Sequence, residues 1–437
     1  MTADNKKPVT IIVLGGGQRG LTYANYATQH PDLAKVVAVA DPREHRRKLF
    51  ARQHHLTPDR LYNDWTDVAA LPRFADAVVI GTLDQLHAPM VTAFSKLGYD
   101  ILCEKPMATT VAECVDMVKD VQAASATAGH PLIFGIGHVL RYSPYNRAVK
   151  QVIDSGALGD IVNIQHMEPV GNQHFAHSFV RGNWSKEEET SFALMTKCCH
   201  DLDILSFYLS GRTPVQISSF GSIGLFKPSR KPKEAGDATR CLDCPAEKDC
   251  VWSAKKIYLD PFVEKGRKGW ASVAVDGDEV NLETITSTLK NGPYGVCVYE
   301  AGNDVVDHQV VNIEYEGGVT ASMTMSAFTE SECNRATVIQ GTKGELRGDM
   351  KTFTVFDFLT RTSKTHTPEE MPGVAHGGGD DGLSQCFIEA VLERDQSKLG
   401  VTPDDVLNSH LTVFAAEQAR KEKRVVDFGA FKAAALA

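Results

Sequence analysis

The stretch Val9-Thr-Ile-Ile-Val-Leu-Gly-Gly-Gly-Gln-Arg-Gly20 decides the fold of this 437-residue chain. Its first half, 9–14, is apolar and β-branched, which predicts a buried strand. The second half follows the pattern G-x-G-x-x-G, which allows a tight turn, close approach of the backbone to a pyrophosphate and close helix–strand packing. The motif alone also fits an ordinary glycine turn. The residues that we expect at a dinucleotide are Gly15, Gly17, Gln18, Arg19 and Gly20.

A second apolar run, 36–40, supports the dinucleotide interpretation because it ends in an acid. Asp41 follows the last glycine of the motif by 21 residues. An acid at this place hydrogen-bonds the ribose hydroxyls and disfavours a 2′-phosphate, so NAD is expected rather than NADP. Arg43, Arg46 and Arg47 lie close behind and form either a solvated helix face or a site that accepts NADP.

Three further apolar runs, at 77–81, 99–103 and 132–137, predict three more strands. Pro106 cannot donate a backbone hydrogen bond, so the middle run ends at Lys105. A lysine is normally a solvated surface residue, but ligands of a doubly wound sheet bind at the carboxyl ends of its strands. The polar residues that follow these strands, and that we expect at the cofactor site, are Thr82, Asp84, His87, Glu104 and Lys105, with His138 after the last strand.

The first 140 residues resemble the glucose–fructose oxidoreductase / inositol dehydrogenase / MocA (Gfo/Idh/MocA) family of NAD(P)-dependent oxidoreductases. The resemblance rests on the glycine motif, Asp41, the histidine after the middle strand and Glu104-Lys105-Pro106. It implies an α/β protein with a Rossmann domain on a doubly wound parallel sheet, here 1–142. A second α/β domain with a large, mostly antiparallel open sheet would then occupy 143–437. The resemblance also implies that Lys105 lies between nicotinamide and a substrate hydroxyl.

The segment 190–203 carries the second half of the expected site. Family members place an Asp four residues before a His and another Asp three residues after it. His200 and Asp203 fit this pattern, but Thr196 stands where the first Asp is expected. The resemblance implies that His200 is an acid/base at the substrate hydroxyl, although a histidine satisfied within a helix is the simpler reading. The missing acid's hydrogen bonds would pass to Lys197 or Asp201, which we expect at the substrate, or to Lys105 alone.

Polar and aromatic side chains are concentrated at 174–184. Sugars are bound by such mixtures of planar donors and aromatic rings, and a guanidinium can clamp an anionic group. An ordinary polar loop explains each residue singly. The substrate candidates here are His174, Arg181, Asn183 and Trp184, and those just past the fifth strand are Arg141 and Tyr142, of which Arg141 could instead anchor the domain junction.

A cysteine-rich insertion at about 227–260 departs from the family pattern. Cys241 and Cys244 are spaced as in Cys-x-x-Cys, and Cys250 follows six residues later. This spacing suits a structural zinc ion, with a labile disulfide or free thiols as alternatives. The fourth ligand is not identified by the sequence.

The bulk composition limits the partners and the compartment. The net charge of −9 excludes the basic footprint of a nucleic-acid-binding protein. The polar N-terminus carries no signal-peptide pattern, and no apolar run approaches the roughly 20 residues of a membrane span. We therefore expect no membrane partner, and the ten cysteines without a secretory signal indicate a cytoplasmic protein with reduced thiols.

Three functions fit these features. The first is an NAD-dependent oxidoreductase acting on a sugar, sugar derivative or polyol. The second is an NAD-dependent glycoside hydrolase that oxidises, eliminates, hydrates and reduces, with an anionic glycoside such as a sulfoquinovoside as substrate. The third is a non-catalytic NAD-sensing regulator on the same fold. The family resemblance adds the expectation of a homodimer or homotetramer.

Overall fold

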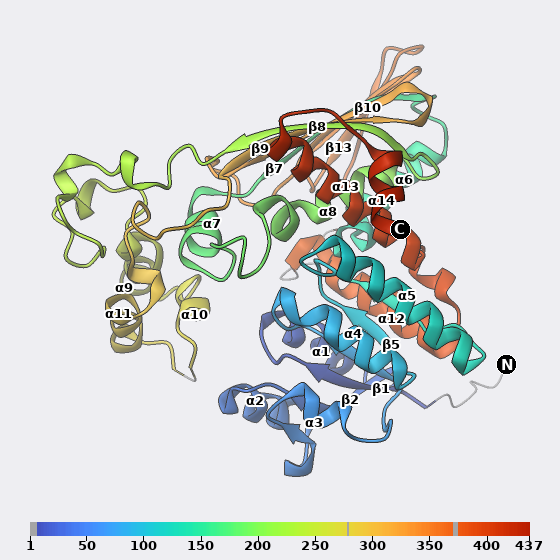
Figure 1. The fold of residues 1–437 in the computed structure, drawn as a ribbon. Helices are drawn as coiled ribbons and strands as arrows, with labels where there is room; N and C mark the ends of the chain where they lie inside the picture. The colour runs from blue at the N-terminus through green and yellow to red at the C-terminus, as the bar shows by residue number, and fades with distance from the viewer. Residues whose placement is uncertain (1–6, 278, 370–374) are drawn as a thin grey trace.

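A computed structural model describes residues 7–277, 279–369 and 375–437, which form two sheets with helices packed against them (Figure 1). The first sheet is entirely parallel, as expected, and runs in the order β3-β2-β1-β4-β5-β6. Its strands are β1 (Val9–Leu14), β2 (Ala34–Ala40), β3 (Leu61–Tyr62), β4 (Ala77–Ile80), β5 (Asp100–Cys103) and β6 (Phe134–Ile136). The buried, apolar β1 has β2 on one side and β4 on the other, so the strand order reverses there and leaves a crevice for a ligand.

Helices cover this sheet as in a doubly wound fold (Figure 1). They are α1 (Gln18–Gln29), α2 (Glu44–His54), α3 (Trp65–Ala69), α4 (His87–Lys96) and α5 (Val111–Ala128). The long α5 begins with a capping box, in which Thr110 and Glu113 each accept a hydrogen bond from the other's backbone N–H. It ends at Gly129, whose φ of +73° suits a left-handed cap.

The register of the parallel strands brings their carboxyl ends to one edge. Leu14 pairs with Ala40 and with Ile80, and Ile80 pairs with Cys103. Cys103 pairs in turn with Ile136. The residues directly after these strands therefore share that edge, and they are Gly15, Asp41, Gly81, Glu104 and Gly137.

The second sheet has nine strands in the order β14-β13-β12-β11-β7-β10-β9-β8-β15. Only β10 and β7 pair in parallel, so the expected mostly antiparallel sheet is confirmed. Its strands are β7 (Ile161–Pro169), β8 (Pro214–Ser222), β9 (His308–Tyr315), β10 (Val319–Ser326), β11 (Ala336–Gly341), β12 (Gly344–Gly348), β13 (Phe353–Asp357), β14 (Ser363–His366) and β15 (Val426–Asp427). Helices α8 (Ala193–Tyr208) and α13 (Pro403–Glu422) pack against one face, so the sheet lies over a single helical layer (Figure 1).

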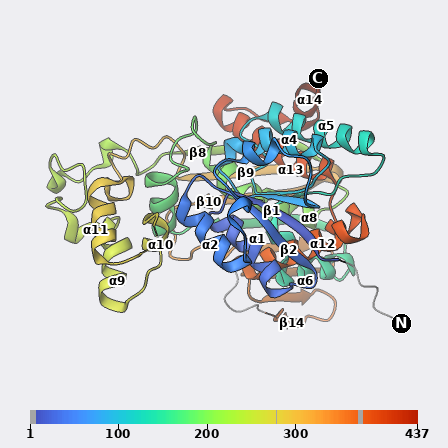
Figure 2. The same ribbon diagram turned by 90° about the horizontal axis from the view of Figure 1, so that it is seen from below.

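Four further α-helices lie outside the segment between β8 and β9 in the described part of the chain. They are α6 (Pro144–Asp154), α7 (Asn172–Phe175) with the π-helical turn Ala176–Arg181, α12 (Gly379–Glu393) and α14 (Phe428–Leu436). Helix α12 packs against α1 and β1, and α13 packs against α5, so the end of the chain returns to the first sheet (Figure 2). Among the described helices, none combines the length and the apolar character needed to cross a bilayer.

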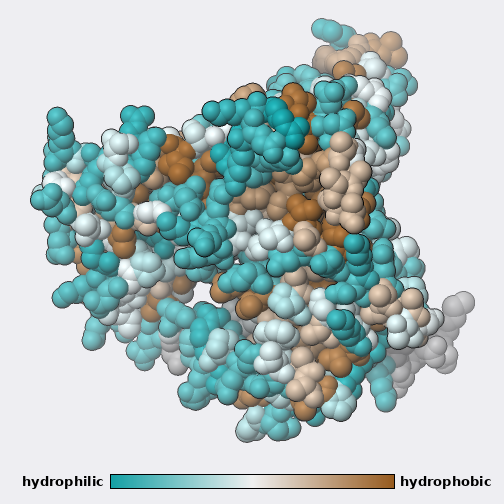
Figure 3. Space-filling view, viewed as in Figure 1, coloured by the Kyte–Doolittle hydropathy of each residue, from teal (hydrophilic) through white to brown (hydrophobic). Residues whose placement is uncertain are grey.

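An excursion of residues 223–307 leaves the second sheet between β8 and β9, and we call it the arm. It contains the expected cysteine-rich segment and continues through α9 (Asp260–Lys265), α10 (Ala271–Ala274) and α11 (Leu282–Asn291). The arm projects to one side and turns its tip towards α2 (Figures 1 and 2). The surface is hollowed between the arm and the first domain (Figure 3).

Candidate active site

The glycine loop forms a cradle in which Gly15 and Gly20 leave no room for a Cβ. Gly15 has φ of +91°, and a Cβ there would lie 2.6 Å from the carbonyl oxygen of Gly81. A Cβ on Gly20 would lie 2.0 Å from the carbonyl oxygen of Gly15. The loop thus packs tightly on β4 while Gly17, at the N-cap of α1, has nothing nearer to its would-be Cβ than Arg43 at 3.6 Å. Because no side chain caps α1, its first N–H groups remain available to a pyrophosphate, and the loop fits NAD.

The acid after β2 faces this loop. Asp41 is buried, and its Oδ2 accepts a hydrogen bond from the backbone N–H of Gly16 at 2.8 Å. Arg43 donates to both carboxylate oxygens, each time at 2.9 Å. Burial would raise the pKa of Asp41, but the hydrogen bonds from Arg43 and Gly16 outweigh it and lower the pKa. The expected ribose acceptor is therefore ionised and already held by a guanidinium.

Two further predicted cofactor residues belong to a buried network behind the loop. Glu104 Oε1 accepts from Arg19 Nε and from the hydroxyl of Tyr23, both at 2.6 Å. Arg19 also donates to Asp380 at 2.6 Å, and the other oxygen of Asp380 lies 3.0 Å from His376 Nδ1. Burial would raise the pKa of Glu104, but Arg19 and the neighbouring lysine hold it below its usual value. The side chains of Arg19 and Glu104 thus bond to each other and do not point into the glycine cradle. Their other partners, Tyr23 and Asp380, were not predicted from the sequence.

Lys105 joins the two domains at the strand end. Glu104 Oε2 accepts from the backbone N–H of Lys105 at 2.9 Å. The ammonium Nζ of Lys105 donates to the carbonyl oxygen of Thr196 in α8 at 2.7 Å. It also lies 5.7 Å from the ring centroid of Trp184. The predicted catalytic lysine is thereby held against the helix that carries the predicted catalytic histidine.

Residues predicted for the cofactor and for the substrate meet beside Lys105. Trp184 Nε1 donates to Asp84 Oδ2 at 2.9 Å, so the predicted substrate loop touches the strand-end segment after β4. Burial raises the pKa of Asp84. His87 Nδ1 lies 2.7 Å from the carbonyl oxygen of Pro106, and its Nε2 is buried without a partner. Asp84, Trp184 and the half-buried Lys105 thus lie together where the two groups of predicted residues meet.

His200 lies one helical turn after Thr196, on the same face of α8. It is buried, and its Nδ1 has no hydrogen-bond partner among the residues that the structure describes. The rings of His138 and His376 lie 6.1 and 5.6 Å from its own ring, centroid to centroid. Burial, reinforced by the positive charge of Lys105, holds the pKa of His200 well below its usual range. The imidazole is therefore neutral at pH 7, with an unprotonated ring nitrogen.

Two other residues of α8 that were predicted as substrate contacts lie in a buried ionic cluster. Asp201 Oδ1 is 2.9 Å from Arg335 Nε and 3.0 Å from His166 Nε2. Glu168 lies 2.7 Å from the same Arg335 nitrogen and 3.3 Å from Lys197 Nζ. Burial would raise the pKa of Asp201, but Arg335 and His166 hold it well below its usual value. Glu168 and Arg335, absent from the sequence candidates, come from β7 and from just before β11.

Arg141 and Tyr142 have internal partners. Arg141 donates to both oxygens of Asp203, at 2.6 and 2.7 Å, and His138 Nδ1 lies 3.0 Å from the same carboxylate. Tyr142 donates its hydroxyl hydrogen to the carbonyl oxygen of Leu399 at 2.8 Å. The geometry thus favours the alternative in which Arg141 anchors the junction between the domains.

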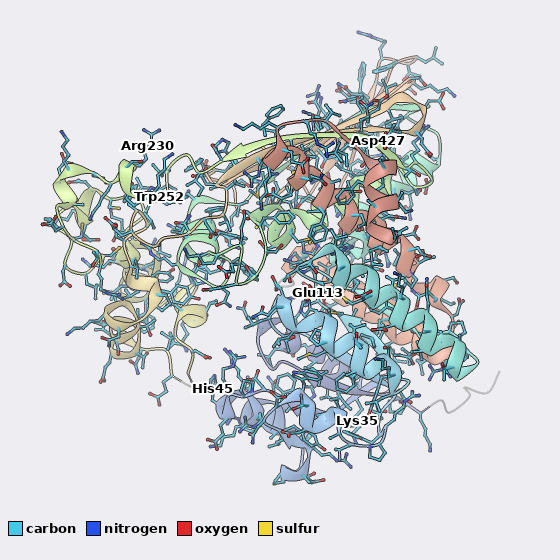
Figure 4. The ribbon with its side chains drawn as sticks, in the orientation of Figure 1. Lys35, His45, Glu113, Arg230, Trp252 and Asp427 are labelled. Carbon is cyan, nitrogen blue, oxygen red and sulfur yellow. The ribbon has the colours of Figure 1, made fainter. Side chains whose placement is uncertain are left out.

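The predicted substrate loop is divided between the site and the arm. Arg181 is buried and donates to the carbonyl oxygens of Val296 and Trp252, at 2.7 and 2.8 Å, and to Cys241 Sγ at 3.3 Å (Trp252 is labelled in Figure 4). This guanidinium therefore holds the arm in place. The ring of His174 lies 5.0 Å from that of Trp270 on the arm.

The other predicted contacts have looser surroundings. Asn183 and Gln18 are exposed. Thr82 lies beside the glycine loop and directs its hydroxyl to Met90 Sδ at 3.6 Å. These three side chains are placed at the surface or rim of the site and make no contact that assigns them a ligand.

The cysteines of the arm approach one another through a short antiparallel bridge. Arg240 pairs with Val296, so Cys241 and Cys297 lie diagonally on one face of the bridge. Among the described residues, the only trio of potential ligand atoms within 4.8 Å of one another is His138, Cys199 and His410. In this trio, His410 Nε2 accepts from the N–H of Met107 and its Nδ1 lies 2.9 Å from the carbonyl oxygen of Val406, so both of its ring nitrogens are already engaged. No trio of the arm cysteines meets this 4.8 Å distance, so their sulfurs do not converge in the described arrangement.

Comparison with known proteins identifies the class to which this fold and site belong. A model described as "Oxidoreductase family, NAD-binding Rossmann fold" matches residues 9–130. A second, "Oxidoreductase family, C-terminal alpha/beta domain", matches residues 150–428. The chain therefore belongs to the Gfo/Idh/MocA family of oxidoreductases, as its sequence motifs indicated.

Two of the curated relatives each match about half of the chain. The chain is 27% identical over 209 residues to 2,7-anhydro-N-acetylneuraminate hydratase of Escherichia coli (strain K12), covering 48% of this chain and 51% of the relative. It is 28% identical over 208 residues to inositol 2-dehydrogenase 1 of Saccharopolyspora erythraea, covering 46% and 55%. It thus spans about half the length of these curated relatives. A levoglucosan dehydrogenase solved with NADH and levoglucosan shares the fold, with a TM-score of 0.69, 17% identity and coverage of 97% and 100%.

Proposed function

We propose that this protein is an NAD-dependent oxidoreductase that removes hydride from a secondary hydroxyl carbon of a sugar or sugar derivative. The observation that carries the proposal is the contact between Lys105 Nζ and the carbonyl oxygen of Thr196, 2.7 Å long. It sets a cation from the nucleotide domain beside the helix face that presents His200. Both groups stand at the end of the sheet where the glycine cradle receives a dinucleotide.

In this proposal the chain divides the work between binding and proton handling. Gly15, Gly17 and Gly20 hold the pyrophosphate, and Asp41 accepts from the adenosine ribose. NAD, when bound, supplies the hydride acceptor. The neutral imidazole of His200 takes the hydroxyl proton, and the Lys105 ammonium stabilises the negative charge that develops on the substrate oxygen.

The substrate is proposed to lie between the Rossmann domain and the loop at 174–184. Trp184 closes over Lys105 and contributes an aromatic face, and its bond to Asp84 keeps water from the reacting atoms. His174 and Lys197 are within reach of each other through Cys333, at 3.4 and 3.0 Å from its sulfur. The names of the inositol and levoglucosan dehydrogenases among its relatives support a polyol or sugar substrate.

A second candidate function is a glycoside hydrolase or hydratase that uses NAD without net consumption. The hydratase relatives of Escherichia coli and Mediterraneibacter gnavus favour it. Oxidation of a hydroxyl acidifies the adjacent C–H, after which elimination, addition of water and return of the hydride complete a redox-neutral cycle. An anionic glycoside such as a sulfoquinovoside belongs to this proposal, although Arg181 and Lys197, the cations expected to bind it, already contact the arm and Glu168.

One experiment separates these functions from an NAD-sensing regulator. The purified chain is incubated with panels of polyols, sugars and aryl glycosides, with and without added NAD. Accumulation of NADH in proportion to product supports the dehydrogenase. Release of the aglycone without NADH supports the redox-neutral enzyme. Binding of NAD without turnover of any compound contradicts both and leaves the regulator.

Three further properties of the protein are proposals: a zinc ion in the arm, the oligomeric state and the cellular compartment. We propose a structural zinc ion on Cys241, Cys244 and Cys250 with Cys297 as fourth ligand: the antiparallel bridge places Cys297 diagonally across from Cys241, and the ion would draw the four sulfurs closer together than they lie in this arrangement. We propose a homodimer or homotetramer through the face of the second sheet opposite α8 and α13, on which Val162 and Phe220 are exposed. We propose a cytoplasmic location, in which the ten cysteines stay reduced.

A further inference from the structure

The tip of the arm touches the nucleotide-binding domain through one carboxylate. Asp276, between α10 and α11, has its Oδ1 3.1 Å from His45 Nε2, 3.5 Å from Arg43 Nη1 and 3.7 Å from Arg46 Nη2. His45 is labelled in Figure 4, where it lies directly below the tip of the arm. The contact spans more than two hundred residues of chain and joins the arm to the start of α2.

The three partners of Asp276 stand where a Rossmann fold distinguishes its cofactors. They follow Asp41 directly, at the carboxyl end of β2. An acid at this place binds the ribose 2′-hydroxyl of NAD, whereas an arginine nearby accommodates the 2′-phosphate of NADP. This chain has both kinds of residue at once, so the residues that follow β2 do not by themselves decide between the two cofactors.

The balance of positive and negative charge around Arg43 and Arg46 depends on Asp276, which the arm supplies. Asp41 is already held by two hydrogen bonds from the Arg43 guanidinium and one from the N–H of Gly16. Arg43 and Arg46 therefore outnumber the Asp41 carboxylate at this place, since the nearby Glu44 pairs with Lys48, and the surplus positive charge would attract a phosphate. Asp276 lies among these cations with its carboxylate half-exposed, in the position of a competing anion.

We propose that Asp276 is a cofactor-selecting residue supplied by the arm. Its carboxylate neutralises the arginine pair and repels a 2′-phosphate, so that the chain binds NAD in preference to NADP while the arm is closed on α2. The inference rests on the proposed use of a nicotinamide dinucleotide. It assigns the choice between the dinucleotides jointly to Asp41 and to a residue of the arm.

The test is equilibrium binding on the full chain, with no turnover required. Isothermal titration measures the dissociation constants of NAD and NADP, and of the fragments 5′-AMP and 2′,5′-ADP, for the wild type and for Asp276→Asn. The substitution removes the charge and keeps the size of the side chain. We expect the preference for NAD over NADP to fall by about tenfold, mainly through tighter binding of NADP and of 2′,5′-ADP.

Glu264→Gln is the matched control, because it removes one negative charge from an exposed position on α9 of the same arm. Its cofactor preference should equal that of the wild type. An unchanged preference in Asp276→Asn, or an equal shift in Glu264→Gln, overturns the assignment of Asp276 and leaves the proposed function standing. Tighter binding of NADP than of NAD by the wild type also overturns it. A wild type that binds neither dinucleotide contradicts the proposed function itself.

Discussion

The ammonium of Lys105 donates to the carbonyl oxygen of Thr196 across 2.7 Å, and this bond fastens the end of β5 to helix α8. The threonine occupies the position where the family pattern has an acid. Its hydroxyl hydrogen bonds within its own helix, to the carbonyl oxygens of Phe192 and Ala193 at 3.4 Å each. The loss of a carboxylate is thus met by a backbone acceptor, and Lys105 keeps its place beside the helix of His200.

Replacement of Lys105 by alanine should abolish most turnover and spare cofactor binding. The ammonium is proposed to stabilise charge that appears only on the reacting oxygen, so its loss should lower kcat by about 10²–10⁴-fold. The measurement is steady-state kinetics on a substrate found by the panel, together with titration of NAD. Lys96→Ala, at an exposed position near the end of α4, is the control. Undiminished turnover in Lys105→Ala would refute the assigned role.

Replacement of Arg335 by methionine should destabilise the protein strongly. The guanidinium lies between the buried carboxylates of Glu168 and Asp201, at 2.7 and 2.9 Å, and its removal leaves both without that counter-charge. We expect the free energy of unfolding to fall by about 3–5 kcal/mol, measured by urea denaturation. Arg347→Met on β12, which breaks an exposed pair with Glu345, should leave the free energy of unfolding nearly unchanged. Equal losses in the two variants would contradict the buried network.

Stability should fall as the pH is lowered below about 6.5, because several histidines are buried in the neutral form. Burial lowers the pKa of His177 to about 4 and that of His410 to about 3. Between these values and about 6.5 the unfolded chain binds the protons and the folded chain does not. The free energy of unfolding therefore decreases by up to about 1.4 kcal/mol per pH unit for each such histidine.

Thermal unfolding between pH 7.5 and 5 in parallel samples of wild type and His410→Gln checks this slope. The variant should lose less stability per pH unit than the wild type. His130→Gln, at an exposed position, should keep the wild-type slope. A wild-type slope in His410→Gln would show that this imidazole binds a proton equally well in both states.

Metal analysis tests the cysteines of the arm. If Cys241, Cys244, Cys250 and Cys297 hold zinc, the purified protein should contain about one ion per chain and chelation should lower its melting temperature. Cys244→Ser should lose the ion, whereas Cys386→Ser on α12 should retain it. A wild-type content well below one ion per chain would refute the zinc proposal and leave free thiols or a labile disulfide.

The parts of the fold predicted from sequence are those governed by short-range patterns. Apolar runs bounded by Gly15, Asp41 and Lys105 predicted buried parallel strands, because buried strands need continuous apolar residues and end where the backbone turns. The glycine spacing predicted a cradle, and a Cβ at Gly15 or Gly20 would indeed collide with backbone oxygens. The sequence also predicted functional residues at neighbouring strand ends, because parallel strands bring their carboxyl ends to the same edge of a sheet.

The direction of side chains on α8 could not be predicted in the same way. Residues that follow one another on a helix are turned by roughly 100°, since a turn contains about 3.6 residues. His200 therefore lies on the face of α8 that carries Thr196, the residue bonded to Lys105. Asp201 is turned towards Arg335 and His166. Both carried a functional prediction of the same kind, and only the packing of the helix separates a proton acceptor from a buried counter-ion.

The amino-acid sequence by itself determined that this chain is an oxidoreductase of the Gfo/Idh/MocA family with a dinucleotide cradle and a strand-end lysine, because those features are encoded by neighbouring residues. The tertiary structure decided which charges meet. Arg19 and Asp380 are 361 positions apart, and Asp276 reaches Arg43 from the far end of the arm. Such pairs form only when the helices and the arm pack against the sheet, since Coulombic and hydrogen-bonding interactions depend on distance in space and not on separation along the chain.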